Sequence, residues 1–173
     1  MADKISTTIT GAAAEHYVMC QLLRRNMIAA LAPTGVPDAD IIVSDRIGSA
    51  LAAVQVKARR DIGRDGGWHM HKKHEIITRD LLFYCFVDFG KTIQDSPRCW
   101  IIPSAIVSEA LKKSHKAWLD APGLKGRKHK DHDMRRLIPD YGDESLPQYR
   151  LGWLDPFADA WDLIARSAHQ NSN

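Results

Sequence analysis

The sequence predicts an α/β domain in which a mixed central β-sheet is flanked by helices. Three observations indicate this fold class: an amphipathic helical pattern opens the chain, short runs of apolar and β-branched residues follow it, and helical patterns close it. At 173 residues, with 45% apolar residues, the chain has the length and composition of one globular domain. We therefore expect residues 1–173 to form a single domain.

The first expected element is a helix over residues 12–26. Ala14, Val18 and Leu22 are four residues apart and share one stripe, and Ser6 is a candidate N-cap before them. Apolar runs predict the first three strands. These runs cover residues 27–31, 39–44 and 51–58, and a Pro/Gly loop at 33–37 separates the first two.

The second half of the chain contains a stronger strand signal. Residues 82–89 form a continuous aromatic and β-branched run, which is typical of a central strand buried on both faces. Residues 99–102 predict another strand, and Pro103 begins a helix that should reach about Lys113. The stretch 68–78 fits either a strand or a helical segment.

These elements predict a core over about residues 7–113 and two segments beyond it. A basic loop is expected over about 114–136. A closing helical segment is expected over about 150–167, with a helix at 153–167 that carries Trp153 and Trp161 into the core.

Basic residues are concentrated in two parts of the chain, although the formal net charge is only +3. Residues 112–136 contain nine Lys/Arg against three Asp, and residues 57–79 contain seven Lys/Arg against three acids. Residues 137–162 reverse this sign, with six acids and one Arg. The asymmetry is typical of a protein with one side that faces a polyanion. An ordinary solvated loop is an equal alternative for 112–136.

The sequence indicates a cytoplasmic protein without a membrane partner. Cys20, Cys85 and Cys99 lie far apart in apolar surroundings, so we expect buried, reduced thiols rather than disulfides or a zinc ribbon. No apolar run approaches the ~20 residues of a membrane span. The first residues lack the apolar stretch of a signal peptide.

The residues that carry chemistry lie on the second and third predicted strands. Asp40 directly precedes Ile41-Ile42-Val43, and Gln55 and Lys57 follow in the next strand. Side chains alternate across a strand, so Gln55 and Lys57 share one face. A tight connection through residues 45–50 would place Asp40 opposite them. A carboxylate, an amide carbonyl and a lysine at one sheet edge can hold a hard cation beside a phosphate.

The order and spacing of these residues resemble the PD-(D/E)XK nuclease superfamily, in its small bacterial variant with a Gln-x-Lys motif. The resemblance spans residues 11–110 and includes Gly11-x-x-x-Glu15 in the first helix. It implies a restriction-endonuclease-like core. It also implies that Asp40 is the motif acid, Gln55 the second position, Lys57 the lysine and Glu15 the helix-borne glutamate. The dipeptide Pro37-Asp38 matches the first two letters of the motif, but Asp40 is anchored to a strand.

The resemblance implies metal-dependent hydrolysis of phosphodiester bonds, in DNA rather than RNA. Mg²⁺, or Mn²⁺ in its place, would take oxygen ligands from Asp40, Glu15, Gln55 and the backbone carbonyl of Val56. Lys57 would orient the attacking water or stabilise charge on the phosphate. By analogy with the family, two copies of the chain would form a homodimer.

Two other hypotheses remain. In one, the chain keeps the nuclease fold and binds nucleic acid but has lost catalysis, because glutamine replaces the second acid. In the other, it is an unrelated structural domain without DNA affinity.

Basic residues next to the lysine strand are candidates for contacts to nucleic-acid phosphates. They are Arg59, Arg60, Arg64, Lys72 and Lys73. Within the same region, Trp68 is expected in the core, with base stacking as an alternative. The histidines at positions 69, 71 and 74 suggest a zinc site, but the intervening lysines favour phosphate contact.

Overall fold

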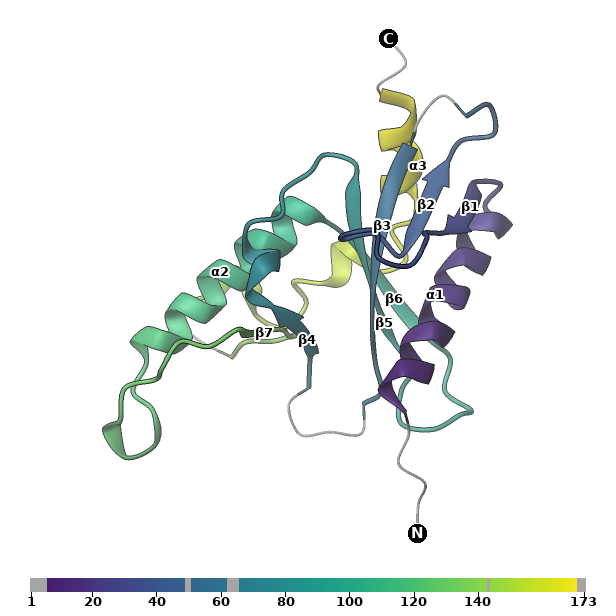
Figure 1. Ribbon diagram of the computed structural model, residues 1–173. Coiled ribbons are helices and arrows are strands. Elements are labelled where there is room, and N and C mark those ends of the chain that lie inside the picture. Colours follow the sequence, from purple (N-terminus) through teal and green to yellow (C-terminus); the bar gives the residue numbers. More distant parts are fainter. Residues whose placement is uncertain (1–5, 49–50, 62–65, 143, 171–173) are drawn as a thin grey trace.

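The computed structural model describes residues 6–48, 51–61, 66–142 and 144–170. Its centre is a five-stranded sheet in the order β1–β2–β3–β5–β6, in which β3 and β5 are parallel and the other neighbours antiparallel (Figure 1). The predicted mixed sheet is therefore confirmed. The strands are β1 (Ile28–Leu31), β2 (Ile41–Ser44), β3 (Leu51–Arg59), β5 (Leu82–Asp88) and β6 (Arg98–Pro103).

Helix α1 spans Thr7–Arg24 and begins earlier than the predicted residue 12. The early start follows from the Ser6 cap, whose Oγ accepts a hydrogen bond from the Ile9 amide at 3.4 Å. The predicted stripe on this helix is confirmed, because its three members are completely buried against the sheet. They are Ala14, Val18 and Leu22.

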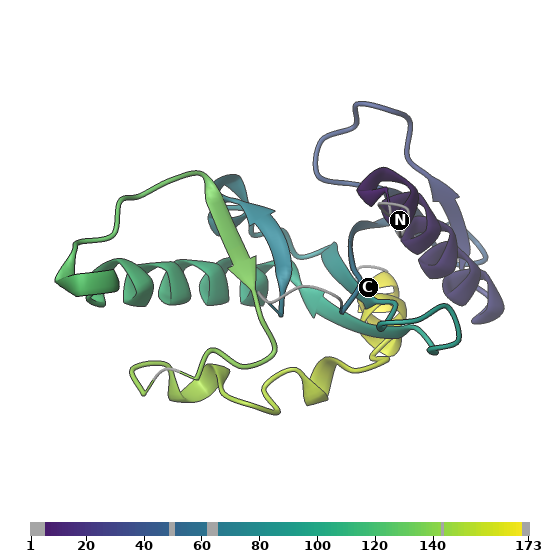
Figure 2. The ribbon, with the colours of Figure 1, turned by 90° about the horizontal axis from the view of Figure 1, so that it is seen from below.

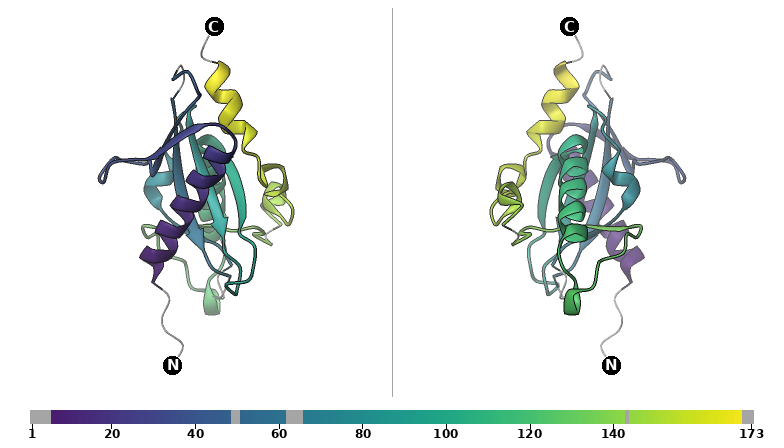
Figure 3. Two further views of the ribbon diagram at one scale, coloured as in Figure 1. Left: turned by 90° about the vertical axis from the view of Figure 1, so that its right-hand side faces the viewer. Right: turned by 90° about the vertical axis from the view of Figure 1, so that its left-hand side faces the viewer.

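The two faces of the sheet carry separate hydrophobic clusters. On one face, α1 and α3 (Asp162–Gln170) pack against inward side chains of β3 such as Val54 and Val56. On the other face, α2 (Ser104–Asp120) packs against Tyr84 and Phe86 of β5. The turned views in Figure 3 show α1 and α2 on opposite sides of the sheet. All seven residues of β5 are buried, which confirms the predicted central strand.

Two segments expected to be loop or ambiguous form a small second sheet. β4 (Trp68–His71) pairs antiparallel with β7 (Met134–Leu137), and the 3₁₀ turn η1 (Lys72–Glu75) follows β4. The ambiguous stretch is thus a strand followed by a short helical turn. Figure 2 shows the β4–β7 pair alongside α2. Local sequence did not reveal β7, because its pairing partner is distant in the chain.

Helix α2 is longer than predicted. It continues past Lys113 to Asp120 and so includes the start of the segment expected to be a basic loop. Leu111 and Ser114 extend its buried stripe. The helix ends where Pro122 follows Ala121, which is extended with φ −74 and ψ 148. Beyond it lies another 3₁₀ turn, η2 (Leu124–Gly126).

The prediction of one closing helix over 153–167 is wrong in its first half. The chain forms two 3₁₀ turns, η3 (Pro147–Tyr149) and η4 (Asp155–Phe157), before α3 begins at Asp162. A positive φ of 49 at Asp159 interrupts any continuous helix. Trp161 is buried as predicted, whereas Trp153 is only partly buried and packs edge-on against Tyr149.

The cysteine prediction holds for two of the three thiols. Cys85 and Cys99 are free and buried, but Cys20 is exposed because it lies outside the buried stripe of α1. Among the helices that the structure describes, none combines the length and apolar character needed to cross a membrane.

Candidate active site

Asp40 lies where the Pro/Gly loop meets β2. Its amide donates to the carbonyl of Val54 at 2.9 Å, and its carbonyl accepts from the amide of Ala32 at 2.9 Å. The register that pairs Ile41 with Val54 then sets Asp40 opposite Gln55. This is the placement that the sequence predicted.

At this end of the sheet, the Asp40 carboxylate accepts a backbone hydrogen bond that a carbonyl of the neighbouring strand would otherwise accept. Its Oδ2 accepts hydrogen bonds from the Val56 amide at 2.7 Å and from the side-chain amide of Gln55. The backbone of Asp38 is left-handed, with φ 61, and turns the chain out of the extended strand conformation. The strand β2 therefore begins only at Ile41. Because the N–H and C=O of one strand residue point to the same neighbour, the Val56 carbonyl also points toward Asp40.

Lys57 projects from the same face of β3 as Gln55, two residues further along. Burial lowers the pKa of Lys57 below its ordinary value, and the negative charge of Asp40 opposes that shift. The ammonium is therefore partly desolvated beside a carboxylate. A desolvated cation interacts more strongly with a phosphate than one in bulk water.

Glu15 reaches the same region from a third element, α1. Burial raises the pKa of Glu15, the charge of Asp40 raises it further, and Lys57 acts in the opposite direction. The Glu15 carboxyl therefore lies within electrostatic range of both groups. The structure places Asp40, Gln55 and Lys57 at one end of β2 and β3, and the charge of Asp40 acts on the Glu15 carboxyl from this end of the sheet. A cation between these carboxylates would relieve the repulsion.

Asp38 has a different role from Asp40. Its Oδ1 accepts from Nζ of Lys73 at 2.9 Å, its Oδ2 accepts from Nη2 of Arg79 at 3.2 Å, and its side chain is only 10% exposed. The hydrogen bond from Lys73 holds the pKa of Asp38 below its usual range. Asp38 therefore ties η1 to the loop that precedes Asp40.

A buried histidine that sequence reasoning did not assign to the site lies next to Lys57. His74 is 3% exposed, and its Nδ1 is 2.7 Å from the hydroxyl of Tyr84, the register partner of Gln55 on β5. Burial, and then the positive charges of Lys57 and Lys73, lower the pKa of His74 to about 4. The imidazole is therefore neutral near pH 7. Its place in the sequence, directly after Lys72 and Lys73 and before Glu75, gave no sign of burial.

The histidine cluster does not form a metal site. His69 and His71 are exposed, whereas His74 points into the core. Among the residues that the structure describes, no three His, Cys, Asp or Glu side chains converge to hold a metal ion.

Arg59 was predicted to contact phosphates, but the structure directs it inward. Its Nε and Nη2 donate to Oδ2 of Asp88 at 3.1 and 2.8 Å, and its guanidinium lies over the ring of Trp68 at 4.3 Å. The Arg59 side chain is only 11% exposed. Trp68 is 1% exposed, so its alternative role in base stacking is wrong and the core prediction is confirmed.

The remaining basic candidates lie at or near the surface. Lys73 is 53% exposed beside Asp38, and Lys72, 54% exposed, pairs with Asp133 at 2.6 Å. Arg60 is half-buried and donates to the carbonyl of Lys91. Arg64 lies outside the described residues. Lys73 therefore remains a candidate for phosphate contact beside the Asp40 site, and Lys72 remains one on the side of η1 that faces Asp133.

Comparisons with known proteins identify the fold. No family model matches the sequence, and no curated protein matches it. The bacterial homing endonuclease I-Ssp6803I superposes with a TM-score of 0.55 and 16% identity, over 97% of this chain and 98% of that one. Hjc, a Holliday junction resolvase from the archaeal hyperthermophile Archaeoglobus fulgidus, gives a TM-score of 0.41 and 13% identity, over 86% and 88%. Together with the mixed sheet flanked by helices, the likeness to the homing endonuclease shows that the chain has a restriction-endonuclease-like fold.

Proposed function

We propose that the protein is a metal-dependent nuclease that hydrolyses phosphodiester bonds in DNA. The observation that supports this most directly is the convergence of Asp40, Gln55 and Lys57 on one end of β2 and β3. Glu15 joins them from α1 and is electrostatically coupled to both Asp40 and Lys57. Carboxylates and a lysine at one sheet edge form a set that suits a hard cation and a phosphate together.

The donor set fits Mg²⁺, with Mn²⁺ as a substitute. Mg²⁺ uses one or two carboxylates, keeps several waters and takes further oxygens from a phosphate substrate. Asp40 and Glu15 would supply the carboxylates, and the Val56 carbonyl points toward the same edge. The Gln55 amide group donates to Asp40, so it orients that carboxylate and would have to turn to offer its own oxygen.

Each residue then has a distinct task. When bound, the ion would polarise the scissile phosphate and lower the pKa of a water. Asp40, held by the Val56 amide and by Gln55, keeps its carboxylate fixed at the sheet edge. Lys57 holds its positive charge where negative charge develops on the phosphate oxygens. Lys73, next to Asp38, lies where it can neutralise a neighbouring phosphate.

Metal dependence is the direct test. The wild type should nick plasmid DNA with Mg²⁺ or Mn²⁺ and stop when EDTA is added. Asp40→Asn should reduce the cleavage rate at least ~10²-fold, because it removes the attraction between the carboxylate and the metal ion. Two opposite unit charges ~4 Å apart attract each other by roughly 4 kcal/mol at an effective dielectric constant near 20. The fold of the variant should persist, because the Asn carbonyl can still accept the Val56 amide.

The matched control is Asp162→Asn, which changes a 53% exposed carboxylate in the first turn of α3. Its cleavage rate should equal that of the wild type. Wild-type protein that leaves plasmid, branched and single-stranded DNA intact with both metals would refute the catalytic proposal.

A second candidate is a nucleic-acid-binding domain that keeps this fold without catalysis. It is favoured by the neutral Gln55 amide, which adds no negative charge to the cation site. It predicts salt-sensitive DNA binding without turnover.

Gln55→Glu separates the two candidates. The new carboxylate would face Oδ2 of Asp40, so the variant should melt at a lower temperature without metal and recover with Mg²⁺. If the wild type is inactive, cleavage should appear in this variant. The control is Gln148→Glu, at an exposed position of η3. A melting temperature of Gln55→Glu that is unaffected by Mg²⁺ would contradict the proposed cation site.

A further inference from the structure

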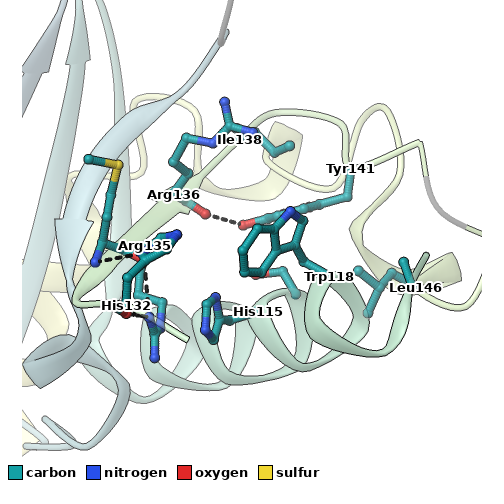
Figure 4. Close-up of a pocket in the computed structure, with 11 residues that line it drawn as sticks. His115, Trp118, His132, Arg135, Arg136, Ile138, Tyr141 and Leu146 are labelled. Carbon is teal, nitrogen blue, oxygen red and sulfur yellow. Dashed lines mark hydrogen bonds between the residues drawn. The ribbon is translucent and has the colours of Figure 1, made fainter. Parts of the chain in front are cut away.

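A cavity of about 430 Å³ lies away from the Asp40 site, between the second half of α2 on one side and β7 with the chain next to it on the other. Its volume is in the range of pockets that bind small ligands, roughly 300–1,000 Å³. Figure 4 shows Trp118 and His115 on α2, with Arg136 and Tyr141 opposite them. The Tyr141 hydroxyl donates to the Arg136 carbonyl at 2.9 Å, which fixes the far wall.

Trp118 gives this cavity its chemical character. It is 36% exposed, whereas Trp68 and Trp161 are at most 2% exposed. Flat rings surround it: His129 lies 4.0 Å from its ring centroid, and His115 is stacked with it at 5.3 Å. Because the His129 and His115 rings already lie against the indole, a further flat ring would stack on its exposed part or take the place of one of these rings.

The segment 112–136, which supplies one side of the cavity, is strongly basic. Residues 112–136 carry nine Lys/Arg and three Asp. The three aspartates each pair within or beside this segment: Asp120 with Lys116, Asp131 with His115 and Arg135, and Asp133 with Lys72. From outside the segment, Glu109 pairs with Lys113 and Glu75 pairs with Arg135, so five acids face the nine bases and a net positive charge remains on the segment. A flat ligand that also carries negative charge would complement both features.

The turn η1 connects this cavity to the candidate active site. On one side, Lys73 pairs with Asp38 at 2.9 Å, next to Asp40. On the other side, Glu75 pairs with the buried side chain of Arg135, which lines the cavity. Lys72 and Lys73 are exposed between them. A polyanionic strand held at the active site could therefore continue along η1 to the cavity.

We infer that the cavity binds an unpaired nucleobase of a nucleic-acid strand, which stacks on Trp118 while the basic residues of 112–136 contact the flanking phosphates. This inference rests on the proposed nuclease function, because it assigns part of the substrate-binding surface. Stacking of one base on an aromatic side chain contributes roughly 1–3 kcal/mol.

The test is fluorescence anisotropy with a fluorescein-labelled single-stranded oligonucleotide in EDTA, so that no cleavage occurs. Trp118→Ala should weaken binding ~5- to 150-fold, which corresponds to roughly 1–3 kcal/mol. Trp118→Phe should retain most of the affinity, because phenylalanine also stacks. Leu151→Ala, which removes an 82% exposed apolar side chain outside the cavity, should bind like the wild type.

A second oligonucleotide of the same length, made abasic throughout, separates stacking from charge. The wild type should bind it more weakly, and Trp118→Ala should bind it as the wild type does. Equal affinities of wild type and Trp118→Ala for the base-containing strand would overturn the inference, as would an equal loss on both oligonucleotides. Circular dichroism of each variant checks that the fold is retained.

These measurements are independent of catalysis. Trp118-dependent binding without metal-dependent cleavage would refute the nuclease and leave the base-binding cavity standing. Cleavage by the wild type together with unchanged binding of Trp118→Ala would refute only the proposal that the cavity binds a nucleobase. If the wild type does not bind the oligonucleotide at all, the proposal that the cavity binds a nucleobase is refuted as well. The plasmid assay would still decide the nuclease proposal.

Discussion

Lys57→Ala is expected to abolish Mg²⁺-dependent DNA cleavage while leaving the fold intact. Lys57 is the cation that faces Asp40 and Glu15, and removing one group that stabilises transition-state charge costs roughly 10²- to 10³-fold in rate. The fold should tolerate the change, because burial disfavours the charged form of this lysine. Single-turnover cleavage with saturating Mg²⁺, together with thermal melting, measures both effects.

The matched control is Lys91→Ala, because Lys91 is a 71% exposed lysine in the β5–β6 loop. Its cleavage rate should stay within about twofold of the wild type. If Lys57→Ala cleaves DNA at the wild-type rate, Lys57 has no part in the chemistry. If the variant unfolds, the lysine has a structural role that its desolvation does not suggest.

Asp88→Ala should cause the largest loss of stability of any substitution considered. Asp88 is completely buried, its Oδ2 accepts from Arg59 and from Arg98 at 2.8 Å, and its Oδ1 accepts from the Gly90 amide at 2.8 Å. Its removal leaves the nearly buried guanidinium of Arg59 without this carboxylate partner, while the contacts of Arg59 with the Gly66 carbonyl and the Trp68 ring remain. Breaking one side of a buried ion pair costs about 3–5 kcal/mol, a large share of the ~5–15 kcal/mol that stabilises a typical domain.

Urea denaturation at pH 7 would measure this loss as a lower midpoint. Asp120→Ala, which breaks an exposed pair with Lys116, should leave the urea midpoint almost unchanged. The double variant Asp88→Ala/Arg59→Met should recover part of the loss, because it removes the uncompensated charge. A free energy of unfolding for Asp88→Ala equal to that of the wild type would show that Arg59 finds another partner or reaches solvent.

The candidate active site could be predicted because its main residues are close in sequence. Asp40 directly precedes β2 and Gln55 lies on β3, and a short connection joins these two strands, so apolar pattern and turn length set their register. Lys57 follows from the alternation of side chains along one strand. What the pattern did not reveal is the hydrogen bonding: the Gln55 amide group faces Asp40.

Contacts between distant segments could not be predicted in the same way. Arg59 looked like a surface base beside the lysine strand, but the parallel register sets it beside Asp88 of β5. Trp118 lay in the stretch of about 114–136 that was expected to be a basic loop. Its partial exposure depends on where α2 ends and where His129 and β7 come to lie.

The sequence by itself determined the elements whose signals are local, because helical and strand periodicities depend only on residues a few positions apart. The buried stripe of α1, the fully buried β5 and the pairing of Asp40 with Gln55 belong to this class. Only the tertiary structure decided the β4–β7 pairing and the inward turn of Arg59. These features depend on the packing of segments that are far apart in the chain, and their free energy is gained only when the whole core assembles.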